Sequence, residues 1–204
     1  MGGLRTRALL TAGLAVAAAW ADAPVTASAA SCALAGSRTV RSTPFARVYY
    51  NRARRPFSCY RLTGRRTALD SQVDRFYTPG DARLGLLRIT KRILGYTWID
   101  PGVPAVYIHS VDMRTGRFKH RTKIEPLIII EPSAVAVPQL VVNAAGSLAW
   151  IQRVEGFYSV WRFDRRGRRR LSGADTTRRI ASLRLRGTRV IWRQAGRLRS
   201  ASLI

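Results

Sequence analysis

Two histidines supply the side chains that ordinarily titrate near neutral pH, and they are the first candidates for a catalytic base. His109 lies in the stretch AVYIHSV, whose composition favours a strand. Strand alternation places Tyr107, His109 and Val111 on one face and Ser110 on the other. A Ser-His-Asp site built from Ser110, His109 and Asp112 therefore fails on geometry, and no G-x-S-x-G turn supplies another nucleophile. We expect His109 to be a strand residue without a catalytic role.

The remaining acid–base groups give no stronger indication of catalysis. His120 is flanked by Lys119 and Arg121, which disfavour its protonated form, and we expect it at a solvated strand end. Glycoside chemistry would need two carboxyl groups about 5 to 10 Å apart. The glutamates, each expected in a turn or loop, are Glu125, Glu131 and Glu155. The sequence also lacks the glycine-rich motifs that bind nucleotides and the close-spaced ligand pairs of a zinc site, so we expect no cofactor.

Arginine clusters are the strongest chemical feature of the sequence. The first cluster occupies a predicted hairpin turn and its exit and consists of Arg165, Arg166, Arg168, Arg169 and Arg170. The second is interleaved with aromatic residues and includes Arg52, Arg54 and Arg55, with Arg61, Arg65 and Arg66 further along. Arginine forks bind phosphate or carboxylate in a bidentate manner, and neighbouring rings can stack on sugars or bases. Both clusters are therefore candidate polyanion-binding residues. The alternative is that they are solvated turns whose composition reflects GC-rich codon usage.

The first 29 residues have the layout of a secretory signal. Arg5 and Arg7 precede an alanine-rich apolar run that is too short to span a bilayer, and Ala27-Ser28-Ala29 is a small-x-small cleavage site. An uncleaved anchor and a lipoprotein with an acylated Cys32 are weaker alternatives. The expected mature part, residues 30–204, forms a single domain and keeps nearly all of the formal net charge of +25.

Only two cysteines occur, Cys32 and Cys59, and both follow the predicted signal. In an exported chain the default is a disulfide between them. The sequence therefore predicts a secreted or extracytoplasmic protein with one disulfide.

The closing stretch, residues 180–204, shows which elements must position these side chains. Leu183 and Leu185 alternate with arginines, and Val190 and Trp192 share one face of the next segment. Turns are expected at 187–188 and 195–196, because glycine interrupts any helix there. This stretch therefore predicts three short antiparallel strands.

Related stretches recur upstream with a period of roughly 40 to 50 residues. The aromatic residues that align are Tyr50, Tyr96, Trp150 and Trp192, and the turn glycines that align are Gly64, Gly116 and Gly167. Two of the turns begin with aspartate, at Asp112 and Asp164, where the carboxylate can bond the turn backbone. About four strands per unit at this period are typical of propeller blades. Between the second and third units, residues 127–130 are expected to form a buried strand, followed by a proline-punctuated linker.

The D-x-x-x-G-R turns and the repeat resemble those of β-propeller-repeat proteins of the Tol-associated type, especially arginine-rich secreted bacterial members. The resemblance covers most of residues 38–204, implies a fold and a compartment, and carries over no functional residue. It departs from the family in length, because six to eight blades are usual there and this chain holds three to four units. The predicted fold is therefore all-β: an antiparallel meander forming a partial or degenerate β-propeller of three to four blade-like units. An open meander or sandwich, or one part of an oligomeric ring, remains as an alternative.

The function that these observations predict is a secreted, non-enzymatic binding or scaffold module. Its arginine-rich face would meet an anionic cell-envelope polymer or an acidic protein. The alternative is a hydrolase or lyase on a propeller scaffold. Nucleic acid is a less favoured polyanion because of the export signal, and no transmembrane span is expected after signal removal. The oligomeric state is not set by the sequence, but we expect a monomer at low salt, where arginine repulsion keeps open strand edges apart.

Overall fold

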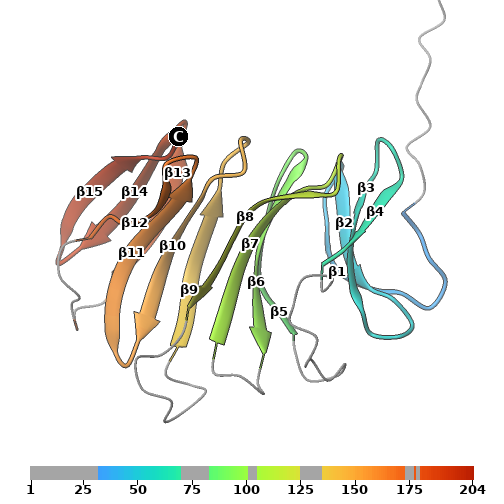
Figure 1. Cartoon of the computed structure of the whole chain (residues 1–204), viewed down its shortest axis with the longest axis horizontal. Helices are drawn as coiled ribbons and strands as arrows, with labels where there is room; N and C mark the ends of the chain where they lie inside the picture. Colours follow the sequence, from blue (N-terminus) through green and yellow to red (C-terminus); the bar gives the residue numbers. More distant parts are fainter. Residues whose placement is uncertain (1–31, 70–82, 101–104, 125–134, 173–176, 178–179) are drawn as a thin grey trace, which may run out of the picture.

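The computed structural model describes residues 32–69, 83–100, 105–124, 135–172, 177 and 180–204 (Figure 1). Within these residues the regular secondary structure consists of β-strands alone. The strands are β1 (Arg38–Ser42), β2 (Ala46–Tyr50), β3 (Pro56–Tyr60), β4 (Arg65–Ala68), β5 (Arg83–Thr90), β6 (Ile93–Asp100), β7 (Ala105–Asp112), β8 (Arg117–Ile124), β9 (Val135–Val142), β10 (Leu148–Val154), β11 (Phe157–Asp164), β12 (Gly167–Arg170), β13 (Ala181–Arg186), β14 (Arg189–Gln194) and β15 (Arg197–Ser202). The predicted signal, 1–29, and the predicted strand at 127–130 lie outside the described residues.

The strands form four antiparallel sheets in which neighbours along the chain are neighbours in space. Their orders are β1-β2-β3-β4, β5-β6-β7-β8, β9-β10-β11-β12 and β13-β14-β15. The sheets stand side by side in chain order, with the first and last at opposite ends of the row, so they do not close into a ring (Figure 1). The prediction of an all-β meander of three to four blade-like units is confirmed, and the last unit has three described strands.

Residues that align in the sequence repeat lie at equivalent positions in the four sheets. Tyr96 and Trp150, like the other two aligned aromatics, lie on the second strand of their sheets. Each aligned turn glycine joins a third strand to a fourth, and each has positive φ: 67° at Gly64, 71° at Gly116 and 88° at Gly167. Glycine adopts this conformation without the steric penalty of a Cβ, so a glycine recurs in the sequence once for each of these sheets.

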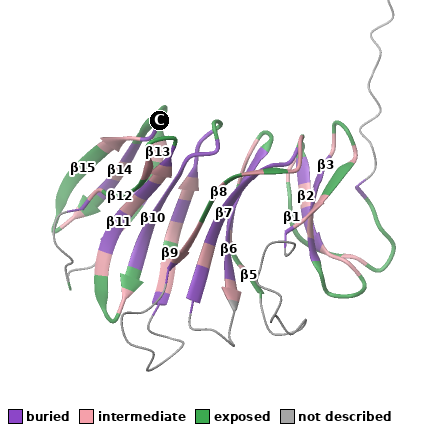
Figure 2. Ribbon diagram, in the orientation of Figure 1, coloured by how far each residue is buried: buried purple, intermediate pink, exposed green. Residues whose placement is uncertain are grey.

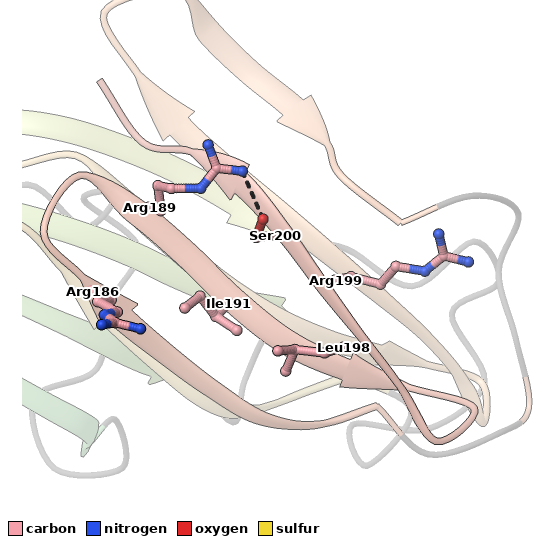
Figure 3. Close-up of a pocket in the computed structure, with 6 residues that line it drawn as sticks. All are labelled: Arg186, Arg189, Ile191, Leu198, Arg199 and Ser200. Carbon is pink, nitrogen blue, oxygen red and sulfur yellow. Dashed lines mark hydrogen bonds between the residues drawn. The ribbon is translucent and has the colours of Figure 1, made fainter.

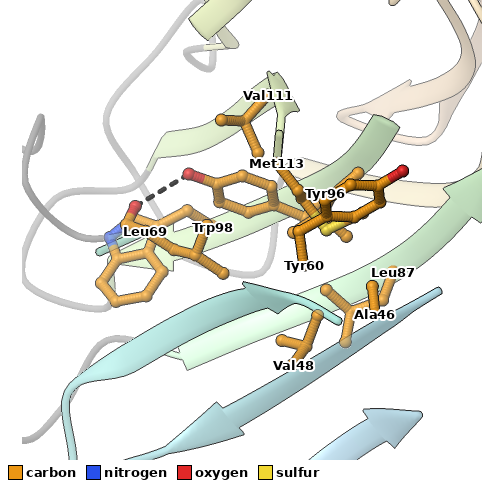
Figure 4. Close-up of a cluster of buried hydrophobic side chains, with 10 residues drawn as sticks. Ala46, Val48, Tyr60, Leu69, Leu87, Tyr96, Trp98, Val111 and Met113 are labelled. Atoms are coloured by element: carbon orange, nitrogen blue, oxygen red, sulfur yellow. Dashed lines mark hydrogen bonds between the residues drawn. The ribbon is translucent and has the colours of Figure 1, made fainter. Parts of the chain in front are cut away.

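Apolar residues fill the space between adjacent sheets in three core clusters. Ala46, Val48 and Tyr60 of the first sheet pack against Tyr96 and Trp98 of the second (Figure 4). The second cluster joins the second and third sheets, and the third cluster joins the third and fourth. Figure 2 shows the result, with buried residues along the inner strands and exposed ones at turns and on β15.

Strand β10 shows why the inner strands have nearly continuous apolar sequences. Leu148 and Trp150 belong to the cluster facing the second sheet, whereas Ala149 and Ile151 belong to the cluster facing the fourth. Successive side chains point to opposite faces of a strand, and here both faces are buried. The stretch LAWI therefore lies between two hydrophobic cores.

A disulfide covers the outer face of the first sheet. Cys32 and Cys59 are bonded, with Cα atoms 5.8 Å apart, as the sequence predicts. Both cysteines are buried with Tyr49, and Phe57 packs on them. The guanidinium of Arg47 lies 4.9 Å from the Tyr49 ring centroid and donates to the Cys32 carbonyl at 2.8 Å. The segment around Cys32 is thus held on this face by a covalent bond and a hydrogen bond.

The prediction of a proline-punctuated linker between the second and third units is partly wrong, because residues 135–142 form strand β9. Pro138 is accommodated for two reasons. Strand β9 ends the order of its sheet, and its register with β10 shifts between the pairs Ile151↔Gln139 and Arg153↔Ala136. Proline is tolerated in sheets at edges and bulges, where its missing N–H is not needed.

Candidate polyanion-binding surface

The environment of His109 does not resemble that of a catalytic base. The ring stacks on Tyr96 and Tyr107, with centroids 5.1 and 6.2 Å away, and meets Phe118 edge-on at 5.8 Å. Burial, reinforced by the charge of Arg121, lowers the pKa of His109 to about 3. Among the described residues neither ring nitrogen has a hydrogen-bond partner.

Ser110 points to the opposite face of β7, as predicted. Its hydroxyl is buried and donates to the carbonyl of Gly146 at 2.6 Å, which ties the second sheet to the third. A serine held in this way, on the other side of the strand from His109, does not form a nucleophile–base pair with it.

His120 corrects a detail of the sequence prediction, because it is not a solvated strand end. Its ring packs on Phe163 of the third sheet, with centroids 4.6 Å apart, and is about half-buried. Burial lowers the pKa of His120, Lys119 lowers it further, and Asp164 opposes them. The sequence could show the neighbours along β8 but not the adjacent sheet.

The turn aspartates act as predicted, and both carboxylates are buried. Asp112 Oδ1 accepts the backbone N–H of Arg114 at 3.0 Å, and Asp164 Oδ1 accepts that of Arg166 at 2.9 Å. The exposed fractions of Asp112 and Asp164 are 3% and 1%. These hairpins therefore present arginine to solvent while their acidic groups face inward.

All five arginines of the first cluster are exposed, but one of them also contacts the neighbouring sheet. Arg165 and Arg166 form the β11–β12 turn and are exposed, as are Arg169 and Arg170 on edge strand β12. Arg168 is exposed as well, but its side chain also bridges to the second sheet. Its guanidinium lies 4.4 Å from the Trp161 ring centroid and donates to the Lys123 carbonyl at 3.2 Å. Burial lowers its pKa below the usual arginine value.

The second cluster is divided: Arg61 lies in the β3–β4 turn and Arg65 and Arg66 begin β4, whereas its other members lie in the β2–β3 turn. Arg52, Arg54 and Arg55 are exposed there, and Asn51 organises the turn by accepting the backbone N–H of Arg55 on Oδ1 at 2.8 Å. Arg54 has a positive φ of 56°, and its N–H bonds the Asn51 carbonyl at 3.0 Å. Of the aromatic residues that surround this cluster in sequence, Tyr49 and Tyr60 are buried in the first sheet and Tyr50 and Phe57 are partly buried.

The structure does not bring Arg52, Arg54 and Arg55 together with the first cluster. Successive connections of a meander alternate between the two ends of a sheet, so a second-to-third turn and a third-to-fourth turn lie at opposite ends. The β2–β3 turn is at the lower end in Figure 1, and the β11–β12 turn is at the upper end. The β2–β3 turn arginines and the first cluster therefore form separate surfaces.

Turns of the first three sheets gather basic residues at the upper end. We call this surface the basic hairpin end, and its members are Arg61, Lys91, Arg92, Arg114, Arg165 and Arg166. The grouping is supported by contacts between turns at this end: Arg92 Nε lies 3.6 Å from Asp112 Oδ2, and the side chain of Arg65 lies against Gly116 of the next sheet. Within the described residues at this end, the carboxylates, those of Asp112 and Asp164, are buried.

Sequence reasoning missed Lys91, Arg92 and Arg114 as members of this surface, because it searched for charges close together along the chain. They could have been predicted from the order of the strands. In each four-stranded meander the first and third turns lie at the same end of the sheet, whatever their separation in sequence.

Within the described ranges no group of three or more histidine, cysteine, aspartate or glutamate residues could hold a metal ion. In the same residues no helix has the length and apolar character to cross a membrane.

Fold and surface together define an all-β protein of open, blade-like sheets with a basic end. No protein-family model and no curated protein matches the sequence. Among solved structures, a chain from a structural and mechanistic analysis of two prolyl endopeptidases is similar, with 11% sequence identity and a TM-score of 0.33. The alignment covers 76% of this chain and 32% of that one, so this protein spans about a third of its length.

Proposed function

We propose that the protein is a non-enzymatic extracytoplasmic binding module whose basic hairpin end binds an anionic polymer of the cell envelope. The observation that carries the proposal is the separation of charge at this end, where exposed basic side chains of the second and third sheets face solvent and the turn carboxylates are buried. The disulfide between Cys32 and Cys59 is compatible with an oxidising compartment outside the cytoplasm.

The arrangement of the sheets suits a polymer better than a small anion. Sheets packed face to face lie about 10 Å apart, so equivalent hairpins present charge at roughly that interval. A small anion would contact one hairpin, whereas a chain of phosphates or carboxylates can contact several. Each contact releases counterions, which makes the affinity additive and strongly salt-dependent.

Retention on immobilised teichoic acid or heparin over a salt series tests the proposal. The test variant is Arg114→Ser/Arg165→Ser/Arg166→Ser, and the matched control is Arg52→Ser/Arg54→Ser/Arg55→Ser at the opposite end. Both remove three positive charges. We expect the test variant to lose roughly tenfold in affinity at low salt and to show a shallower salt slope, by about two to three, while the control changes little.

Equal losses in the two variants would mean that only net charge matters and would overturn the proposal. The polymer should also be recovered at its original length after prolonged incubation. Shortened polymer would instead support the alternative of a hydrolase or lyase on this scaffold.

A further inference from the structure

The last sheet, β13-β14-β15, has one face in the core and one face that no described element covers. Residues directly opposite in an antiparallel pair share a face, so the pairs Arg184↔Ile191, Arg186↔Arg189 and Ile191↔Ser200 define the outer face. The pair Arg193↔Leu198 extends it. We call this surface the end face. The opposite side of the sheet carries Leu183, Val190 and Trp192, which are buried against the third sheet.

The end face is hollowed and has an apolar floor (Figure 3). The hollow has a volume of about 440 Å³ and is lined by Arg186, Arg189, Ile191, Leu198, Arg199 and Ser200. Leu198 is 64% exposed, the largest exposure among the large hydrophobic residues described. Arg189 donates from Nη2 to Ser200 Oγ at 2.7 Å and so is held beside the floor (Figure 3).

The two ends of the row of sheets differ in how they are covered. The outer face of the first sheet is covered by its own chain, through the Cys32–Cys59 disulfide and the contacts of Arg47. The end face has no equivalent cover among the described residues. Strand β15 also ends the order of its sheet, so one of its edges lacks a described partner strand.

The positive charge of the end face indicates which kind of molecule could cover it. A second copy in the same orientation would oppose arginine with arginine. A copy docked by its first sheet would also bring positive charge, because Arg47 and Arg66 are paired with Cys59 on that outer face. A purely polar polyanion would leave Ile191 and Leu198 exposed. An extended acidic chain matches both features when its carboxylates and apolar side chains lie two residues apart, since residues at every second position of a strand point the same way and would face the sheet together.

We propose that the end face docks an extended acidic segment of a partner protein, in which the side chains facing the sheet, at every second position, include both carboxylates and apolar groups. Apolar side chains of the segment occupy the hollow over Ile191 and Leu198. Its carboxylates pair with the arginine forks around the hollow, Arg186 and Arg189 foremost. This site is separate from the basic hairpin end and does not rest on the function proposed for it.

The probe for this site is the fluorescent octapeptide Glu-Ser-Val-Ser-Glu-Ser-Val-Ser, in which glutamate and valine share one face of an extended chain. The comparison peptide, Glu-Val-Ser-Ser-Glu-Val-Ser-Ser, has the same composition with glutamate and valine on opposite faces. Binding is followed by anisotropy on the oxidised, full mature protein. We expect the probe to bind at least about fivefold more tightly than the comparison peptide. Leu198→Ser should remove most of this preference, because it deletes the apolar floor without changing charge. Leu198 is exposed, so the fold should be retained, and a thermal melt of the variant checks this.

A second comparison locates the peptide. Arg186→Ser/Arg189→Ser should weaken its binding by about tenfold, whereas the charge-matched Arg165→Ser/Arg166→Ser should leave it within about twofold. The proposal is overturned if the comparison peptide binds equally well, or if the second variant has the larger effect. It is also overturned if the protein alone self-associates at low salt through Leu198, which would make a second copy the occupant. Teichoic acid retention is measured on the same variants, so that failure at either site is seen separately.

Discussion

His109 carries a polar, titratable ring within an aromatic layer. The sequence predicted its strand and its face, because alternation along AVYIHSV is local. It could not predict the depth of burial, which comes from Tyr96 on the neighbouring strand and from the packing of the first sheet on the second. The same limit explains His120, whose contact with Phe163 crosses from one sheet to the next.

We predict that His109 makes the fold sensitive to acid. Its pKa is about 3 when folded against 6.5 ordinarily, so the unfolded chain takes up the proton first as pH falls. Stability is therefore fully present above pH 6.5 and declines toward pH 3, by up to about 1.4 kcal/mol per pH unit. His109→Phe keeps an aromatic ring and should remove most of this decline. Urea unfolding at pH 7 and pH 5 measures it, with His120→Asn as the control. If wild type and His109→Phe lose stability equally between these pH values, His109 is not the cause.

The hairpins that end in Gly-Arg share a sequence plan, yet their aspartates have different structural roles. Asp112 bonds its turn and lies near Arg92, whose side chain is 44% exposed. Asp164 lies 3.3 Å from Arg162 Nη1, and the exposed fraction of the Arg162 side chain is 9%. Asp164 also accepts the backbone N–H of Ile204 at 3.4 Å, and Arg162 donates to the Ser202 carbonyl at 2.7 Å. Asp164 thus links the third sheet to the last.

Because of this difference, we predict that Asp164→Ala destabilises the fold more than Asp112→Ala. Removing Asp164 leaves the buried guanidinium of Arg162 without its carboxylate, which costs about 3 to 5 kcal/mol. Removing Asp112 loses a turn hydrogen bond beside a solvated arginine, at about 1 kcal/mol. Chemical denaturation of the two variants gives both values. Equal losses, or a larger one for Asp112→Ala, would contradict the role assigned to the Arg162–Asp164 pair.

Elements were predictable from the sequence where their signals are local, and less so where they depend on neighbours. The closing strands β13 to β15 follow from alternation and from glycine at 187 and 196, and the structure places them there. Strand β9 was partly missed because Pro138 is a breaker in isolation and becomes acceptable only at an edge with a shifted register. The basic hairpin end was missed in part because it groups turns that are distant in sequence.

At the scale of the whole molecule, both outer faces of the row carry arginine and the row is open. We predict a monomer at low salt, where repulsion keeps β15 and the end face from pairing with another copy, and larger species once salt or a polyanion screens that repulsion. Sedimentation velocity across a salt series measures the change. A tight dimer at the lowest salt would show that the arginines do not prevent pairing.

The three core clusters, each shared by two adjacent sheets, also determine how the molecule comes apart. A closed ring gives every blade two neighbours, whereas this open row gives the first and last sheets one each. Its energetics are those of a short one-dimensional array, in which every module contributes its own stability and an interface term with the next. The first sheet offsets its missing neighbour with a covalent cross-link, and the last has no such reinforcement among the described residues. Thermal opening should therefore begin at β13 to β15 and travel inward, with the disulfide-linked end the last to melt.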